Sequence, residues 1–129
     1  MHTDQELNYL TKSLQHHPSP YIIYELDGSI AWANIAANYI FNLSALDELA
    51  VVKIDEKITN NFGDLDSIAL YYDTPIEISL RQINFFMRTR VHMIPVDISS
   101  GIMLIELLCS SRSGLDALRK TIDCIEHKR

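Results

Sequence analysis

The feature that most constrains the fold is the segment from Tyr21 to Phe41, which reads YIIYELDGSIAWANIAANYIF. Two short apolar runs flank Asp27-Gly28, a dipeptide that favours the tight turn of a two-residue β-hairpin. From Asn34 onward the apolar residues recur at helical spacing, and asparagine is a preferred residue at the N-terminal cap of a helix. The segment therefore predicts an antiparallel hairpin that leads directly into a helix.

Three later stretches have the patterns of β-strands. Residues 76–80 and 85–94 alternate apolar and polar side chains, which is typical of strands with one buried face. Gly101 to Cys109 is apolar on both sides, as expected for a covered central strand. We expect Pro75 to open the first of these strands, because proline cannot donate to a sheet. Residues 44–73 are acidic and less regular, and we expect two or three short helices there.

Both ends of the chain predict amphipathic helices, because apolar residues at spacings of three and four make a stripe on each. The stripes are Leu7, Leu10 and Leu14 at the N-terminus, and Leu115, Leu118, Ile122 and Ile125 at the C-terminus. An exposed stripe favours aggregation, so we expect the first to pack on the outer face of a sheet or against a second copy. The second is expected to lead toward an output domain beyond Arg129. The chain thus divides into a helix (1–17), a core (18–112) and a helix (113–129).

Composition narrows the class of protein. The 129 residues suffice for one domain with a core of its own. A net charge of −6 argues against a nucleic-acid partner, because phosphate binding needs a positive surface. No apolar stretch approaches the roughly 20 residues of a membrane span, and the first residues lack the pattern of a secretory signal. We therefore expect a cytoplasmic protein without membrane contact, in which Cys109 and Cys124 are reduced.

The order of predicted elements resembles that of PAS sensor domains. The resemblance rests on the turn, the second strand and the first helix, namely Asp27, Gly28, Ile30, Asn34, Ala36 and Ala37. It implies an α+β fold with a five-stranded antiparallel sheet, short helices on one face and flanking helices at both ends. It also implies a sensory and dimerisation module of a bacterial signalling or transcription-regulatory protein, which would form a homodimer through its N-terminal helix. The segment LNYLTKSLQHHPSP also looks like the start of sensor regions in bacterial transcriptional regulators, including the conjugation activators of F-like plasmids.

The resemblance also bears on cofactors. Light-sensing flavin PAS domains carry an Asn-Cys-Arg signature in the middle segment, whereas residues 44–73 contain no cysteine, so a covalent flavin adduct is not expected. Haem-binding members use a histidine of that segment, and the five histidines lie elsewhere, at positions 2, 16, 17, 92 and 127. A flavin held without a covalent bond would have Trp32 as its neighbour. We expect no metal site, because His16 and His17 point about 100° apart on a helix.

A small organic ligand would lie in the core between the sheet and the helices. Its pocket is expected to be lined by Tyr39, Ile58, Leu70, Met87, Thr89, Val91 and Met93. The alternative is that these side chains simply fill the core. The chain would then be a ligand-free dimerisation scaffold, as in a sensor histidine kinase.

Catalysis finds little support in the sequence, which has no nucleophile elbow, phosphate loop or zinc-protease motif. We expect a protein that is not an enzyme. The alternative is a small isomerase-like enzyme with a curved sheet, which would need a carboxylate of raised pKa in its cavity, and only Asp73 or Glu106 could supply it.

The basic residues Arg81, Arg88, Arg90 and His92 gather on and beside one predicted strand. They would form either a site for an anion or an acidic partner, or a solvated sheet face paired with Glu77 and Glu106. We favour the second interpretation.

Overall fold

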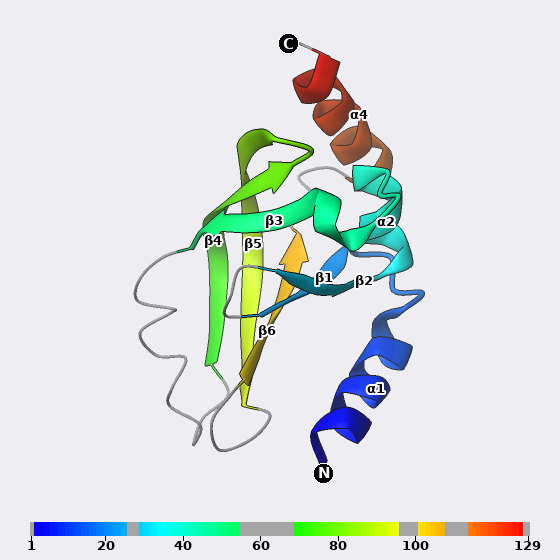
Figure 1. Ribbon diagram of the computed structural model, residues 1–129, viewed down its shortest axis with the longest axis vertical. Coiled ribbons are helices and arrows are strands. Elements are labelled where there is room, and N and C mark those ends of the chain that lie inside the picture. Colours follow the sequence, from blue (N-terminus) through cyan, green and yellow to red (C-terminus); the bar gives the residue numbers. More distant parts are fainter. Residues whose placement is uncertain (1, 26–28, 55–68, 96–100, 108–113, 128–129) are drawn as a thin grey trace.

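The computed structural model describes residues 2–25, 29–54, 69–95, 101–107 and 114–127. Within these ranges the side chains of residues 2–7, 69–72, 93–95, 101–103 and 114–115 lie outside the description. The helical elements are α1 (His2–Leu14), α2 (Ile35–Phe41), the 3-10 turn η1 (Leu46–Glu48) and α4 (Gly114–His127). The strands are β1 (Tyr21–Tyr24), β2 (Ile30–Ala33), β3 (Leu49–Lys53), β4 (Ala69–Leu80), β5 (Ile83–Pro95) and β6 (Gly101–Leu107). Figure 1 shows α1 and α4 at opposite ends of the molecule.

The strands form one antiparallel sheet in the order β2-β1-β6-β5-β4-β3. The predicted hairpin is confirmed, since β1 pairs with β2, although the Asp27-Gly28 turn itself lies outside the described residues. The two edge strands also meet, because Ser29, just before β2, bridges Ala50 of β3. The sheet is therefore curved until its edges touch, which shields backbone groups that an open edge would expose.

The main core lies on the concave side of this sheet. Its strand residues include Ile22, Ile76, Ile78, Val91 and Ile105, all with no exposed surface. Helix α2 adds Ala37, Ile40 and Phe41, and α4 adds Ile122, which is 1% exposed. The two helices contact each other, with α4 at one end of the molecule and α2 nearer its middle (Figure 1). Elements from both halves of the chain thus enclose one apolar interior.

A second apolar cluster lies on the outer face of the sheet. Tyr21, Ile23 and Leu104 form it, and Leu10, Leu14 and Trp32 pack against them. Helix α1 therefore covers the β1–β6 part of this face, as one of the two placements expected for its apolar stripe. Leu7 belongs to α1, but its side chain is outside the described set.

The middle of the chain differs from the expectation of two or three short helices over residues 44–73. Its described parts contain only the turn η1, the strand β3 and the start of β4, while residues 55–68 lie outside the description. Strand β3 at Leu49–Lys53 stands where short helices were expected, because LAVVK alternates buried and less buried residues and contains two β-branched valines. The sheet accordingly has six described strands where five were expected.

Pro75 lies inside β4 rather than at its start, which corrects a second expectation. The register of β4 shifts between Tyr71 and Thr74, and Asp73 has a positive φ of 51°. Strand β3 pairs with β4 only from Glu77 to Leu80. At Pro75, β4 therefore has no described neighbour on its β3 side, and a residue without an N–H is tolerated in such an edge position.

Candidate functional site

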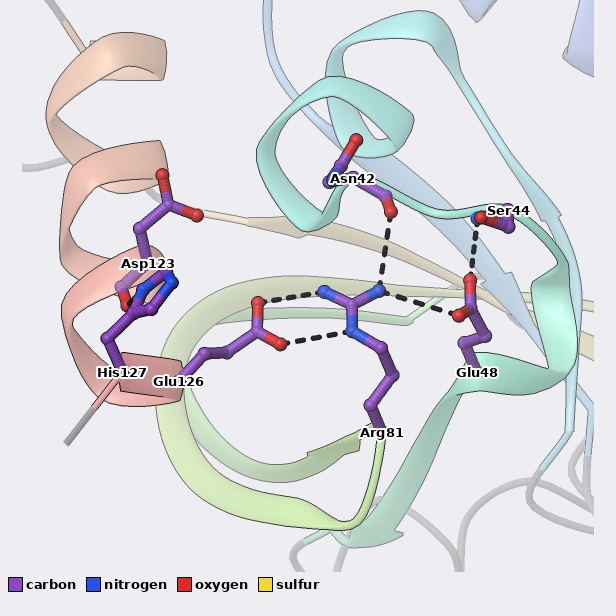
Figure 2. A pocket seen from close by; sticks show the side chains of 7 residues that line it. All are labelled: Asn42, Ser44, Glu48, Arg81, Asp123, Glu126 and His127. Atoms are coloured by element: carbon purple, nitrogen blue, oxygen red, sulfur yellow. Dashed lines mark hydrogen bonds and ion pairs between the residues drawn. The ribbon is translucent and has the colours of Figure 1, made fainter. Parts of the chain in front are cut away.

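A polar pocket lies where the end of α2, the turn η1, the β4–β5 turn and the last part of α4 meet (Figure 2). Its volume is about 410 Å³. The residues that line it are Asn42, Ser44, Glu48, Arg81, Asp123, Glu126 and His127. We call this the Arg81 pocket, because that side chain contacts all three of the other elements.

Arg81 reaches the pocket from an unusual backbone position. Leu80 pairs with Ile83, so Arg81 and Gln82 are the two loop residues of the β4–β5 hairpin. Both have positive φ angles, of 47° and 73°, as the favoured two-residue hairpin turns require. Residues other than glycine and asparagine pay roughly 1–2 kcal/mol for that conformation. The turn thus accepts a strained backbone that directs an arginine toward α4.

The guanidinium of Arg81 holds Glu126 of α4 in a two-pronged contact. Its Nε and Nη2 donate to the two carboxylate oxygens of Glu126 at 3.0 and 2.8 Å. This fork-to-fork geometry is among the strongest side-chain contacts available, and it raises the pKa of Arg81 further. Figure 2 shows the two carboxylates of Glu126 and Glu48 on either side of the guanidinium.

The same guanidinium also closes the end of α2. Nη2 donates to the backbone oxygen of Phe41 at 2.8 Å, and Nη1 donates to that of Asn42 at 3.3 Å. Asn42 ends the helix in the left-handed conformation, with φ and ψ both 52°. The last carbonyls of a helix have no partner within it, so Arg81 satisfies acceptors that α2 leaves open.

Glu48 supplies a second carboxylate, whose Oε2 lies 3.7 Å from Arg81 Nη1. Its Oε1 accepts from the backbone N–H groups of Ser44 at 2.6 Å and Ala45 at 3.1 Å. These backbone hydrogen bonds are the main reason that the pKa of Glu48 is lowered, with a smaller contribution from Arg81. The Arg81 backbone N–H donates to the backbone oxygen of Glu48 at 2.9 Å. The β4–β5 turn is therefore joined to η1 by main chain as well as side chain.

Helix α4 is held at a second place, on Tyr39 of α2. The Tyr39 hydroxyl donates to Asp116 at 2.8 Å, and this hydrogen bond raises the pKa of Tyr39. The guanidinium carbon of Arg119 lies 5.1 Å from the centre of the Tyr39 ring, and its Nη1 donates to the Tyr39 backbone oxygen. On the apolar side, Ile122 enters the core and Leu118 packs against it. Polar and apolar contacts together dock α4 on the body of the protein.

Through these contacts the Arg81 pocket joins the end of α2, the turn η1, the β4–β5 turn and α4. All three nitrogens of Arg81 already have acceptors within the chain. Among the residues that the structure describes, no group of three or more His, Cys, Asp or Glu side chains could hold a metal ion.

The residues predicted to line a ligand pocket fall in three places. Met87, Thr89 and Val91 alternate along β5 and face the interior, with exposed fractions of 7%, 0% and 0%. Thr89 Oγ1 donates to the Thr74 backbone oxygen at 2.8 Å. Tyr39 is instead 46% exposed and faces α4.

The remaining predicted lining residues cannot be placed by their side chains. Leu70 and Met93 lie on β4 and β5, but their side chains are outside the description, and Ile58 lies outside the described residues altogether. A ligand site beneath β5 therefore stays a prediction.

The C-terminal stripe is used within the chain. Ile122 is buried, Leu118 packs on the core and Ile125 is partly buried, while the side chain of Leu115 is not described. Sequence reasoning placed Arg81 in a basic patch and missed Glu126. One signal in the sequence could have indicated a special role for Arg81: it is a charged residue at a hairpin-turn position that glycine or asparagine usually occupies.

Two other basic residues of the patch, Arg88 and Arg90, lie on the outer sheet face in ion pairs, whereas His92 has no ion pair within the described part of the chain and its Nε2 is buried without a hydrogen-bond partner there. Arg90 Nη1 lies 2.8 Å from Glu106, and Arg88 Nη1 lies 2.7 Å from Asp73. Glu77 accepts from Asn84 rather than from an arginine. The two carboxylates considered for catalysis, Asp73 and Glu106, are thus engaged by arginines.

Glu106 also affects Tyr21, its neighbour on β1. Burial raises the pKa of Tyr21 to about 12, with further contributions from the charge of Glu106 and a hydrogen bond to it. Tyr21 and Glu106 are 8% exposed each. This part of the outer face, beneath α1, is therefore a buried polar junction.

Trp32, considered as the neighbour of a flavin, lies on the outer side of the sheet. It packs against the cluster beneath α1 and lines a second hollow of about 270 Å³ together with Thr11, Lys12, Gln15 and His16. It therefore does not face the interior in which a core ligand would lie.

No protein-family model and no curated protein matches this chain. Solved structures do resemble it. The structure of the E. coli DhaR(N)–DhaL complex has 12% identity and a TM-score of 0.50, over 82% of this chain and 36% of the other. The PAS domain of Bordetella pertussis BvgS has 16% identity and a TM-score of 0.44, over 94% and 98% of the two chains. A PAS domain from a two-component sensor histidine kinase has 8% identity and a TM-score of 0.43, over 81% and 96%.

At these identities the likeness concerns the fold alone. The chain spans about a third of the length of the E. coli chain that it matches. The predicted α+β, PAS-like fold is confirmed, with one strand more than expected. Among the described helices, none is long and apolar enough to cross a membrane.

Proposed function

We propose that this chain is a non-catalytic sensory and dimerisation module with a PAS-like fold, and that α4 passes its state to an output domain. The docking of α4 carries the proposal. Ile122 is 1% exposed in the core, and Glu126 is held by the Arg81 fork at 2.8 and 3.0 Å. A change in the packing of the core or in the β4–β5 turn would therefore alter the contacts that hold α4 in place.

The proposed input is a small organic ligand in the interior beside Met87, Thr89 and Val91. Such a ligand shifts α4 only by binding the docked and the released arrangements with different affinity. Leu118 and Ile122 contact the core in the docked arrangement, so they are available to another helix only when α4 is released. The alternative is a ligand-free scaffold, in which α4 stays docked and the module only joins subunits.

The proposed setting is the cytoplasm of a bacterium, within a signalling or transcription-regulatory protein. The E. coli structure of similar fold is a complex of DhaR(N) with DhaL. That likeness supports a protein partner as a second form of input, which would act on the same helix.

Hydrogen exchange of α4 tests the proposed coupling. Met87 and Phe86 are neighbours on β5 that face opposite sides of the sheet, with exposed fractions of 7% and 70%. Met87→Ala should speed amide exchange in residues 118–126 relative to β1, because it loosens the core beneath the helix. Phe86→Ala should leave that exchange unchanged. Equal exchange of α4 in both variants and the wild type would reject α4 as the element that reports on the core.

Native mass spectrometry separates the two forms of the proposal. A small molecule retained by the purified protein, and lost from Thr89→Trp, would identify the ligand sensor. A protein that carries no small molecule, together with α4 exchange unchanged by a library of small organic compounds, would favour the ligand-free scaffold.

A further inference from the structure

The outer face of the sheet is only partly covered. Helix α1 packs on its β1–β6 part through Leu10 and Leu14. On the β4–β5 hairpin the outward side chains are Pro75, Glu77 and Ser79 on one strand and Asn84, Phe86 and Arg88 on the other, since their neighbours Ile76, Ile78 and Met87 are buried. We call these six residues the hairpin face.

Phe86 lies near the middle of the hairpin face and is 70% exposed. It is paired with Glu77 across the strands, and Arg88 lies two residues along on the same side. Single exposed apolar side chains are common on protein surfaces, but an aromatic residue ringed by polar ones is a typical anchor of a protein interface. Tyr39, another exposed aromatic residue, already contacts α4.

The charges around Phe86 have both signs. Arg88 and Lys53 are positive, and Asp73 and Glu77 are negative, with Lys53 paired beside Glu77 on β3. The chain as a whole carries a net charge of −6, so two copies repel each other over most of their surface. In a two-fold contact each partner presents the same patch, and only a patch with both signs complements itself.

The ion pair of the hairpin face is also easily rearranged. Arg88 and Asp73 lie 2.7 Å apart, but their side chains remain 68% and 61% exposed. Exposed pairs of this kind contribute little to stability, so Arg88 can exchange its partner for a carboxylate of another copy at small cost.

We propose that the hairpin face, with Phe86 at its centre, is the surface on which a second copy of this chain docks. The proposal rests on the dimerisation part of the proposed function and names its surface. In contrast to an interface through α1, it leaves Leu10 and Leu14 in their places against the sheet. The balanced charges favour a second copy over an acidic or a basic partner, which would fit a patch of a single sign.

Sedimentation equilibrium over a range of concentrations tests the proposal. The wild type should dimerise, and Phe86→Glu should weaken the dimer at least tenfold, with an unchanged circular dichroism spectrum because the side chain is exposed. The matched control is Tyr9→Glu, which alters an aromatic residue 76% exposed on α1. It should leave the dimer unchanged. Loss of the dimer in Tyr9→Glu with its retention in Phe86→Glu would overturn the proposal in favour of α1.

Reversing the charge of either residue gives a result that a folding defect would not produce. Glu77→Arg and Arg88→Glu should each weaken self-association, and a mixture of the two variants should form a heterodimer. A mixture that stays monomeric would count against the hairpin face. A wild type that is monomeric at every concentration would overturn both this surface and the dimer itself. The hydrogen-exchange test of α4 concerns contacts within one protomer, so its outcome does not depend on dimerisation.

Discussion

A single buried amide joins three segments of this protein. The side chain of Asn34 has no exposed surface. Its Oδ1 accepts from the backbone N–H groups of Tyr21 at 2.9 Å and Ala37 at 3.0 Å. Its Nδ2 donates to the backbone oxygens of Leu14 and Ser19, both at 2.9 Å. Asn34 therefore caps α2, anchors the start of β1 and ties the end of α1 to both.

Asn34→Ala should lower the free energy of unfolding by about 2–4 kcal/mol, because it removes a helix cap and leaves buried backbone groups without partners. Urea denaturation measures the change. The control is Asn38→Ala, which removes two hydrogen bonds to backbone oxygens from a partly buried side chain. It should cost clearly less, and equal losses in the two variants would contradict the role assigned to Asn34.

His92 should make stability depend on pH. Burial lowers its pKa below the ordinary value of 6.5, and the nearby charges of Glu106 and Arg90 act in opposite directions. As the pH falls below about 6.5, the unfolded chain therefore binds a proton before the folded one does, and stability decreases until the folded pKa is passed. Above about 6.5 both states are neutral and His92 contributes no dependence.

The measurement compares urea midpoints at about pH 7.5 and about pH 5.5 for the wild type and His92→Gln. The wild type should lose more stability between the two values than the variant does. A variant with the same loss would show that other groups account for the dependence.

At the scale of elements, the β4–β5 turn accepts strain in order to place Arg81. Gln82, its second loop residue, has a φ of 73° and is exposed. Gln82→Gly should raise the free energy of unfolding by about 0.5–1 kcal/mol, because glycine adopts this conformation without the clash of a Cβ atom. Urea denaturation tests it against Asn84→Gly, a substitution within β5 that should destabilise. A loss of stability in Gln82→Gly would mean that the turn is not strained there.

The Arg81 fork should determine how firmly α4 is held. Arg81→Lys keeps the positive charge but loses the planar fork, so the docking of α4 should weaken by about 1–2 kcal/mol. Amide exchange in residues 118–126 reports the change. Arg88→Lys is the control, since that ion pair is 68% and 61% exposed and should matter by less than about 0.5 kcal/mol. Equal exchange of α4 in both variants would exclude the fork as its main tether.

At the scale of the whole molecule, the last helix completes a core that begins with β1. Ile122 belongs to the same cluster as Ile22 and Ile105. Ile122→Ala should therefore lower the stability of the entire protein by about 2–4 kcal/mol in one cooperative transition, as a cavity in a shared core does. Ile125→Ala, on a partly buried position, should cost less. Two separate transitions in Ile122→Ala would show that α4 unfolds independently of the sheet.

Much of the fold could be predicted because it depends on neighbours in the sequence. The alternation over residues 76–80 and 85–94 predicts strands, and Asn34 predicts the cap of α2, from a few residues each. The same reasoning failed over Leu49–Lys53, where an acidic and irregular context concealed a short run with a period of two. The same reasoning also placed Pro75 at a strand end. Proline is tolerated inside β4 because β3 does not pair with β4 at that position, and β3 lies more than twenty residues away along the chain, so no local pattern shows this.

The candidate site was less predictable. Arg81 and Glu126 are 45 residues apart, and no local pattern pairs them. Likewise Tyr39 has the spacing of a core residue on α2, yet it meets Asp116, 77 residues later. In both cases the partner is determined by where α4 lies.

Most of the helices and strands, with β3 as an exception, and the apolar faces of those elements follow from the sequence, because they depend on steric preferences and periodicity within a few residues. The folded chain as a whole fixes the curvature of the sheet until Ser29 meets Ala50, the burial of Ile122 in the shared core and the exposure of Phe86. Those outcomes depend on how apolar faces far apart in the chain share a limited interior, and one chain offers several apolar stripes of which only some can be covered.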